Sequence, residues 1–147
     1  MEIIRVKYGS DLYKKLIDYA ENCSWIAGKH LAQILRENNF LEWEAVFAAV
    51  EDGEIIGFCT FLETDYYPEN RYSHWISSIF VDEKFRGNKI SFRLIENTIE
   101  YAKMQSFKKV YIPSDMIGFY EKCGFVKIDE LVNYGGDTDN IFVKEIL

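Results

Sequence analysis

Residues 85–91 read FRGNKIS, and this short stretch decides how the rest of the chain is interpreted. It follows an apolar run, WISSIFV (75–81), and precedes a helical pattern, SFRLIENTIEYAKM (91–104). The first amides of a helix lack intrahelical acceptors and lie at the positive end of the helix dipole. A basic turn at that position, here with Arg86 and Lys89, is therefore typical of an anion site.

Other phosphate-binding designs do not fit this turn. A Walker loop needs GxxxxGK[ST], and a dinucleotide fingerprint needs GxGxxG, whereas the turn holds only Gly87. The remaining design is a helix N-terminus with flanking basic groups. Gly87 would allow the tight turn by which the chain enters that helix. The plain alternative is a solvated helix end, since Lys84, Arg86, Lys89 and Arg93 are also what an exposed surface would carry.

Composition narrows the class of protein. The chain has 147 residues, 48% of them hydrophobic, which suits one domain, and we expect a single domain over 1–147. The formal net charge of −7 argues against a nucleic-acid partner and favours a small polyanionic ligand at the local basic patch. No apolar run reaches the length of a membrane span, so no membrane partner is expected.

The cysteines and the N-terminus indicate the compartment. Cys23, Cys59 and Cys123 are odd in number and form no CxxC pair, which argues against a disulfide framework or a structural metal site. The N-terminal residues carry charges where a signal peptide would be apolar. We therefore expect a cytoplasmic protein without a bound metal.

Hydrophobic periodicity predicts strands at 3–8, 45–51, 54–64, 74–81, 108–114, 125–132 and 141–147, and helices at 11–22, 25–38, 88–105 and 116–123. Ser10 and Ser24 are expected to cap the first two helices, the second weakened by its glycine. Asp52-Gly53 between two apolar runs predicts a β-hairpin. Gly124 is expected to end the last helix in the left-handed conformation.

The order of these elements predicts an α+β fold of the α/β/α sandwich type. Three consecutive strands before the long helix exclude a regular doubly wound sheet. The segment 74–114 can form one right-handed βαβ crossover, and the other strands read as antiparallel, the last two joined by the polar turn NYGGDTDN. We expect a mixed, mostly antiparallel sheet with helices on both faces.

With IFVDEKFRGNKIS (79–91) and FYEKCGF (119–125) in this order of elements, the chain resembles the GCN5-related N-acetyltransferases, the GNAT superfamily. The family loop, Arg/Gln-x-x-Gly-x-Gly/Ala, grips the pyrophosphate of acetyl-CoA, and Arg86 matches its first position. Lys89 stands where the family has its first glycine and Ser91 where it has Gly or Ala. We expect Lys89 to have a negative φ, so that its Cβ is no obstacle. The resemblance covers most of the chain.

The resemblance implies a sheet that splays between the strands at 74–81 and 108–114 and binds acetyl-CoA as cosubstrate. Main-chain groups near the end of the first of these strands would bind the pantetheine arm, although the same residues also read as buried strand core. The cofactor-binding residues so implied are Ile79, Phe80, Val81, Arg86, Gly87, Asn88, Lys89, Ile90, Ser91, Ser114 and Phe119. Asp115, beside Ser114, is a further polar residue at the strand end.

The resemblance also implies a catalytic residue, Tyr120, in the family's Φ-Tyr-x-x-x-Gly-Phe pattern. Its phenol, with an ordinary pKa near ~10, can protonate the departing CoA thiolate. The alternative is a tyrosine that only packs against the sheet. A nucleophilic Cys123 is disfavoured, because a helix C-terminus opposes the thiolate.

The general base and the acceptor stay open. The family often has a glutamate where this chain has Trp75, which leaves His74, Glu63 or water as the base. The acceptor pocket is expected between 58–75 and the first helices. The residues expected there are Phe58, Phe61, Glu63, Asp65, Tyr66, Tyr67, Tyr72 and Trp75, which equally suit a core with a solvated rim.

These observations predict an N-acetyltransferase that moves the acetyl group of acetyl-CoA to a primary amine of a small molecule or peptide, by direct attack in a ternary complex. The competing hypothesis is a non-catalytic acyl-CoA-binding regulatory module of the same fold. Tyr120 and the intact Gly124-Phe125 favour the enzyme, whereas Lys89 and the missing glutamate favour the module. GNAT proteins often form homodimers through edge strands, but the oligomeric state cannot be read from the sequence.

Overall fold

The computed structural model describes residues 1–114 and 118–147, so the candidate Asp115 and the first two residues of the helix predicted at 116–123 lie outside the described residues. The elements, in chain order, are β1 (Glu2–Arg5), α1 (Asp11–Asn22), α2 (Ala27–Glu37), β2 (Ala45–Glu51), β3 (Glu54–Leu62), β4 (Trp75–Val81), the 3₁₀ helix η1 (Glu83–Phe85), α3 (Ile90–Met104), β5 (Lys109–Ser114), α4 (Phe119–Lys122), β6 (Val126–Val132) and β7 (Thr138–Glu145). The predicted order of strands and helices is confirmed, with η1 as an addition. None of the described helices is both long enough and apolar enough to cross a membrane.

The seven strands form one sheet in the order β1-β2-β3-β4-β5-β7-β6. β1 with β2, β5 with β7 and β6 with β7 pair antiparallel, whereas β4 and β5 pair parallel, as a βαβ crossover through α3 requires. The register of β4 with β5 consists of one pair, Trp75 with Tyr111.

The chain divides into two compact units, each built from two stretches of sequence. The first comprises residues 1–60 and 78–97, and the second comprises 61–77 and 98–147. β3, β4 and α3 therefore contribute residues to both units.

The core of the first unit is formed by α1, α2 and the inward faces of its strands. Its buried residues are Val6, Tyr13, Leu16, Ala20, Leu31, Ala32, Leu35, Val46, Ala48, Ile55, Phe58 and Phe80. α1 begins as predicted, with the Ser10 side chain accepting from Tyr13 N at 3.2 Å. The predicted cap Ser24 is wrong, because α2 begins after Ile26, whose side chain makes no cap bond. Gly28 lies inside α2 because any Cβ there would collide with the Ala20 carbonyl.

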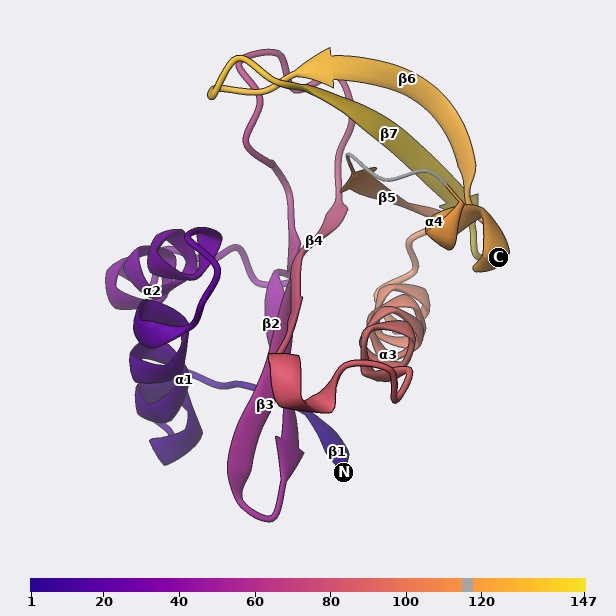
Figure 1. Ribbon diagram of the computed structural model, residues 1–147. Helices are drawn as coiled ribbons and strands as arrows, with labels where there is room; N and C mark the ends of the chain where they lie inside the picture. Colours follow the sequence, from indigo (N-terminus) through magenta and orange to yellow (C-terminus); the bar gives the residue numbers. More distant parts are fainter. Residues whose placement is uncertain (115–117) are drawn as a thin grey trace. The chain divides into compact units, whose positions relative to one another are not determined.

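Helices cover both faces of the strands in the first unit. Val46 and Ala48 of β2 point into the core shared with α1 and α2. Because side chains alternate along a strand, Phe47 and Ala49 face the other side, where they are also buried. Figure 1 shows α1 and α2 together on one side of β2 and β3 and the start of α3 on the other. The predicted helices on both faces are thus confirmed.

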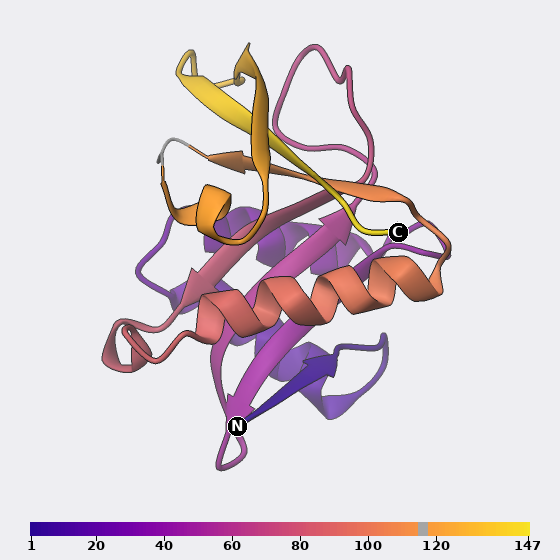
Figure 2. The ribbon, with the colours of Figure 1, turned by 90° about the vertical axis from the view of Figure 1, so that its right-hand side faces the viewer.

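The second unit is organised by the β6–β7 hairpin and β5, with α4 beside them in Figure 2. Tyr67, Trp75, Tyr111, Leu131 and Ile141 form its buried cluster. The connection between β6 and β7 is shorter than predicted, because β7 already begins at Thr138. The turn closes with Asn133 N donating to Asp137 O at 2.8 Å.

Candidate functional site

The segment that links β4 to α3 is held to the first unit at its start. The backbone N–H of Asp82 donates to Ile56 O at 2.7 Å, which ties the end of β4 to β3. The Asp82 side chain then caps η1 by accepting from Lys84 N at 3.1 Å. The basic turn that follows therefore starts from a fixed position.

Arg86 is exposed but its base is anchored. Its Nε donates to Val81 O at 3.0 Å, and its guanidinium carbon lies 5.7 Å from the centre of the Phe80 ring. The bond to Val81 uses only one of the guanidinium's several N–H donors. Arg86 is thus oriented by β4 while its terminal nitrogens can reach an anion.

The backbone of the turn corrects one prediction. Gly87 has φ +87, a conformation that favours glycine, and Asn88 Nδ2 donates to Phe85 O at 3.0 Å across the turn. Lys89, for which a negative φ was predicted, has φ +59. This left-handed conformation is rarely adopted by a residue with a Cβ and costs on the order of 1 kcal/mol. Lys89 therefore stands at a position whose backbone suits the family's glycine.

α3 begins directly after this turn. Arg93 N donates to Lys89 O at 3.1 Å, which makes Lys89 the residue that caps the helix, with Ile90 and Ser91 in its first turn. No acidic side chain occupies the first turn of α3, so nothing there offsets the positive end of the helix dipole. The side chain of Ile90 is buried and fixes the backbone of the turn. The arrangement suits a bound anion such as a pyrophosphate.

β4 is irregular where the cosubstrate was predicted to bind. Ser78 has φ +51 in the middle of the strand, as at a β-bulge, so the strict alternation of side chains is interrupted there. Beyond it Phe80 is buried and stacks on Phe58 at 5.3 Å, whereas Ile79 and Val81 are half-buried. The side chain of Phe80 thus belongs to the core, and a ligand on this strand has the main chain to bind.

Gly57 is a residue that the sequence analysis missed. A Cβ at Gly57 would lie 2.6 Å from Phe80 O, closer than any real side chain lies. The close approach of β3 and β4 at this point therefore requires glycine, and it holds the strand end that carries the predicted pantetheine contacts. A glycine in the interior of a predicted strand, as here, is the signal that could have identified it.

Tyr120 lies in the short helix α4 of the second unit. The side chain is 8% exposed, and its ring lies 5.7 Å from Phe142 and 6.2 Å from Phe125. Its carbonyl accepts from Phe125 N at 3.0 Å, and Gly124 ends the segment with φ +91, the left-handed conformation that was predicted. The ring of Tyr120 therefore has a packing role in the core, whether or not its hydroxyl also has a chemical role.

The comparisons with known proteins agree with these motifs. A family model described as the acetyltransferase (GNAT) family matches residues 21–125. The chain belongs to this family. As the motifs predicted, it is an acetyltransferase, and its acetyl donor is acetyl-CoA. No match is found among curated protein sequences.

Solved structures establish the fold of this acetyltransferase. An aminoglycoside 6'-acetyltransferase type Ii shares 22% identity with a TM-score of 0.77, over 100% of this chain and 98% of that one. An aminoglycoside 6'-N-acetyltransferase complexed with coenzyme A shares 17% identity with a TM-score of 0.75, over 100% and 98%. A GNAT acetyltransferase from Elizabethkingia anophelis with acetyl-CoA bound shares 21% with a TM-score of 0.65, over 98% and 97%. The predicted GNAT fold is confirmed.

The other predicted residues of the acetyltransferase on the second unit have mixed surroundings. Ser114 is half-buried at the end of β5, where it pairs with Asn140 of β7. Phe119 is 36% exposed and contacts the Tyr120 ring edge-to-face at 5.1 Å. Cys123 follows α4, and its carbonyl accepts from Lys144 Nζ at 2.8 Å. A cation paired with that carbonyl stabilises the helix end.

The two side chains weighed as the base, His74 and Glu63, differ in their surroundings. His74, with φ +54, precedes β4, and its Nε2 donates to Lys109 O at 2.6 Å while its ring lies 4.1 Å from Phe107. Burial lowers the pKa of His74, so the ring is neutral near pH 7. Trp75, in the position of the family's glutamate, is fully buried, and Glu63 is exposed after β3.

Most of the aromatic residues expected to line the acceptor pocket are core residues instead. Phe58, Phe61, Tyr67 and Trp75 are at most 2% exposed, so they line no open surface. The sequence had left open this alternative, in which these aromatic residues belong to the protein core rather than to a pocket. Tyr66, by contrast, is 51% exposed and lies edge-to-face with the exposed Tyr134 at 5.2 Å.

A hollow of about 390 Å³ lies in the first unit between the end of α1 and the end of β4. Its floor includes Tyr19 and Phe80, and its rim carries three carboxylates, of Asp18, Asp82 and Glu83, against one lysine. Tyr19 OH donates to Asp82 Oδ2 at 3.2 Å, and burial together with this carboxylate raises the pKa of Tyr19. Sequence reasoning did not find this hollow, because its walls come from separate elements.

Proposed function

We propose that this acetyltransferase transfers the acetyl group of acetyl-CoA to a primary amine by direct attack within a ternary complex, acting as one domain over 1–147. The observation that carries the proposal is the turn before α3. There Arg86 is anchored to Val81 O, Gly87 and Lys89 adopt left-handed backbone conformations, and the first turn of the helix lacks an acid. The pyrophosphate would accept from the amides of this turn, including Asn88, Ile90 and Ser91.

The pantetheine arm is proposed to run along the main chain of β4. Beyond the irregularity at Ser78, Ile79 and Val81 are half-buried, so their N–H and C=O groups can pair with an amide-containing arm. Backbone N–H groups of the same strand would polarise the acetyl oxygen as negative charge develops on it. Phe119 and Ser114 are proposed as further contacts of the cosubstrate.

The chemical step is an acyl transfer. The neutral amine nitrogen bonds to the acetyl carbon, the bond from that carbon to sulfur breaks, and the thiolate accepts a proton from the hydroxyl of Tyr120. The amine loses one proton to a base, for which His74, Glu63 and water remain candidates. His74 is neutral near pH 7, but its Nε2 donates to a backbone carbonyl, so only Nδ1 could accept a proton.

The acceptor is proposed to be a cationic amine. The carboxylate-rimmed hollow beside Phe80 supports this, because its three acids and aromatic floor favour a positively charged group. We also propose a cytoplasmic enzyme, in keeping with the absence of disulfides among the described cysteines.

A thermal-shift titration with acetyl-CoA tests the proposal. A ligand that binds only the folded state at about 100 times its Kd adds roughly 2.7 kcal/mol, which raises the Tm of a chain of this size by roughly 5–10 °C. Adenosine fragments without the pyrophosphate should shift the Tm far less. No shift at about 1 mM acetyl-CoA would contradict binding at the turn.

The family match to acetyltransferases favours the enzyme over the alternative that the sequence left open, a non-catalytic acyl-CoA-binding module. Such a module predicts the same thermal shift but no release of CoA. Measuring free thiol with a panel of mono- and polycationic amines separates the two, since only the enzyme releases CoA in proportion to the amine. A homodimer would be detected in the same samples by sedimentation velocity.

A further inference from the structure

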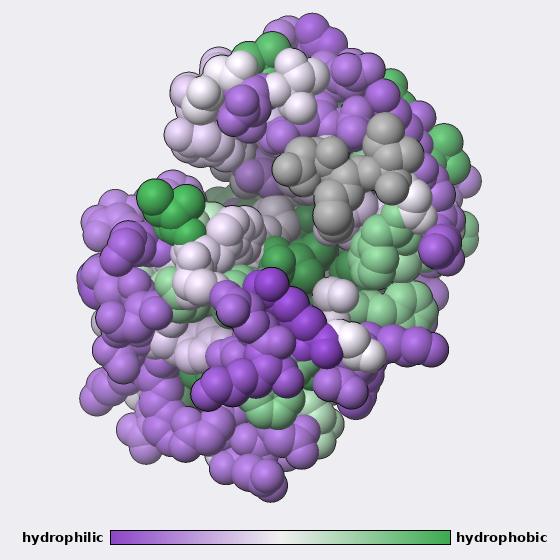
Figure 3. Space-filling model, viewed as in Figure 1, coloured by the Kyte–Doolittle hydropathy of each residue, from purple (hydrophilic) through white to green (hydrophobic). Residues whose placement is uncertain are grey.

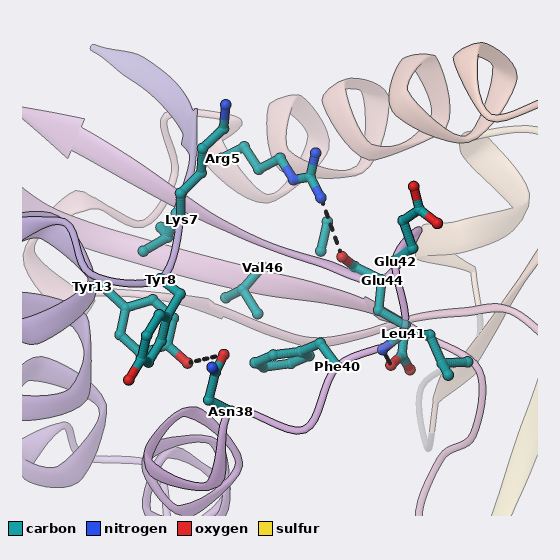
Figure 4. Close-up of a pocket in the computed structure, with 12 residues that line it drawn as sticks. Arg5, Lys7, Tyr8, Tyr13, Asn38, Phe40, Leu41, Glu42, Glu44 and Val46 are labelled. Atoms are coloured by element: carbon teal, nitrogen blue, oxygen red, sulfur yellow. Dashed lines mark hydrogen bonds between the residues drawn. The ribbon is translucent and has the colours of Figure 1, made fainter.

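A second cavity, of about 340 Å³, lies in the first unit where the chain leaves β1, α2 ends and β2 begins. None of the residues assigned to acetyl-CoA lines it. Figure 4 shows Tyr8 and Tyr13 on one side of the cavity, Phe40 on the other and Val46 between them. A volume in this range and a wall of aromatic and aliphatic side chains are typical of small-molecule sites.

The aromatic wall is rigid. Tyr13 is 5% exposed, and its hydroxyl lies 2.6 Å from Leu35 O and 3.4 Å from Asn38 Oδ1, so its ring is held in place at the cavity (Figure 4). Tyr8 meets that ring edge-to-face at 5.4 Å and is itself 71% exposed. Leu41, on the other side, is 44% exposed. Two large apolar side chains are thus left at the rim of a preformed cavity.

The charged residues of the cavity fall into two groups. Arg5 and Glu44 are engaged within the protein, because Arg5 Nη2 donates to Glu44 O at 3.4 Å and Glu44 Oε1 accepts from Leu41 N at 2.6 Å. The side chains of Lys7 and Glu42, in contrast, make no hydrogen bond or ion pair with any residue of 1–114 or 118–147. They lie toward opposite ends of the cavity, one from the β1 side and one from the connection between α2 and β2 (Figure 4).

We propose that this cavity binds a small zwitterion with an apolar body, its carboxylate toward Lys7 and its ammonium toward Glu42. A flat or branched apolar body covers the half-buried Phe40 ring between the exposed Tyr8 and Leu41, which removes apolar surface from water. Opposite charges at the two ends select against molecules of a single sign, since a lone cation or anion would leave one end unmatched. The site does not depend on acetyl transfer.

The test uses 4-(aminomethyl)benzoate, whose ammonium and carboxylate are held apart by a ring. 4-Methylbenzylamine and 4-methylbenzoate serve as matched compounds that each lack one charge. Amide chemical shifts of ¹⁵N-labelled protein are followed during titration without acetyl-CoA. We expect a Kd on the order of 1 mM for a molecule of this size, with shifts at Lys7, Asn38, Phe40 and Val46.

Two variants and two controls locate the charged contacts. Lys7→Gln and Glu42→Gln each remove one charge from an exposed side chain, so the fold should be retained. Each should weaken binding of the zwitterion about threefold or more. Lys15→Gln and Glu54→Gln make the same changes at exposed positions outside the cavity and should leave the Kd unchanged.

Each remaining outcome is decisive. Equal affinity for all three compounds, or equal affinity in Lys7→Gln and Lys15→Gln, would overturn the pairing of charges. Shifts confined to residues around Asp82 would mean that the amine binds the other hollow, and the proposal would fail. Shifts that depend on protein concentration without ligand would show that a second copy covers the cavity, which also contradicts it.

Discussion

The turn before α3 and the segment around Tyr120 are both motifs of the family, but they are built in opposite ways. In the turn, Arg86, Gly87 and Lys89 are exposed, and the binding groups are mostly backbone amides. In α4 the candidate group is one hydroxyl on a ring buried between Phe125 and Phe142. Side chains can therefore vary in the turn without loss of its chemistry, whereas Tyr120 combines a structural and a proposed chemical role.

The largest expected effect is on stability, in Tyr120→Ala. Removing a ring that is 8% exposed leaves a cavity against two phenylalanines and should lower the free energy of unfolding by roughly 3–5 kcal/mol. That corresponds to a fall in Tm of roughly 6–20 °C. Denaturant unfolding followed by circular dichroism measures it.

Phe119→Ala is the matched control on the same helix. The Phe119 side chain is 36% exposed, so its loss should cost clearly less, on the order of 1 kcal/mol. Equal destabilisation by the two variants would mean that the ring of Tyr120 has no special packing role, and the contrast between the two regions would be lost.

Next in size is the effect of Arg86→Ala on acetyl-CoA. Loss of a hydrogen bond to a charged group should cost roughly 1.5–3 kcal/mol, seen as a rise of about 10- to 150-fold in the KM for acetyl-CoA. The rise should shrink at high salt. The Tm without ligand should hardly change, because the Arg86 side chain is exposed.

Lys84→Ala controls for the loss of any basic charge near the turn. Lys84 is exposed in η1, and its backbone rather than its side chain takes part in the cap by Asp82. A KM that rises as much in Lys84→Ala as in Arg86→Ala would assign the effect to net charge rather than to the anchored guanidinium.

Tyr120→Phe keeps the ring and removes only the hydroxyl, so it distinguishes the structural role of Tyr120 from its proposed chemical role. If the hydroxyl protonates the thiolate, kcat should fall about 10- to 100-fold, the low end for a general acid, because water can substitute. The KM for acetyl-CoA should change little, since the packing of the ring is kept. Full turnover per folded molecule, with or without a lower Tm, would leave Tyr120 a structural residue.

Sequence reasoning succeeded where local patterns and topology agree. The order of elements, the Asp52-Gly53 hairpin turn with φ of +50 and +80, and the left-handed Gly124 all follow from short-range rules that hold in any context. The basic turn before α3 was found for the same reason, because its neighbours in space are its neighbours in sequence.

The sequence could not predict features that depend on contacts between separate elements. Strand periodicity did not reveal the positive φ of Ser78, and the requirement for glycine at Gly57 comes from the approach of Phe80 O on another strand. Most of the aromatic residues expected around the acceptor are core residues, because residue type alone does not say which aromatic side chains the fold buries. The hollow around Asp82 and the cavity around Val46 each join elements that lie far apart in the chain.

The smallest expected effect is that of Lys89→Gly. This substitution tests whether the backbone or the Lys89 side chain determines the stability of the turn and its binding of acetyl-CoA. A lysine at φ +59 has a conformational strain on the order of 1 kcal/mol, which glycine does not have. Glycine in turn loses more conformational entropy on folding, which costs roughly 0.5–1 kcal/mol. The two nearly cancel, so stability should be unchanged or rise by less than about 1 kcal/mol.

Lys84→Gly is the matched control for this substitution, because Lys84 is equally exposed but is not among the residues with positive φ. There only the entropic loss applies, and stability should fall by roughly 0.5–1 kcal/mol. Loss of the Lys89 ammonium should raise the KM for acetyl-CoA less than Arg86→Ala does, since the backbone amides remain. A Lys89→Gly variant as destabilised as Lys84→Gly would contradict the left-handed backbone. A KM raised as much as in Arg86→Ala would show that side chains, not amides, carry phosphate binding in this turn.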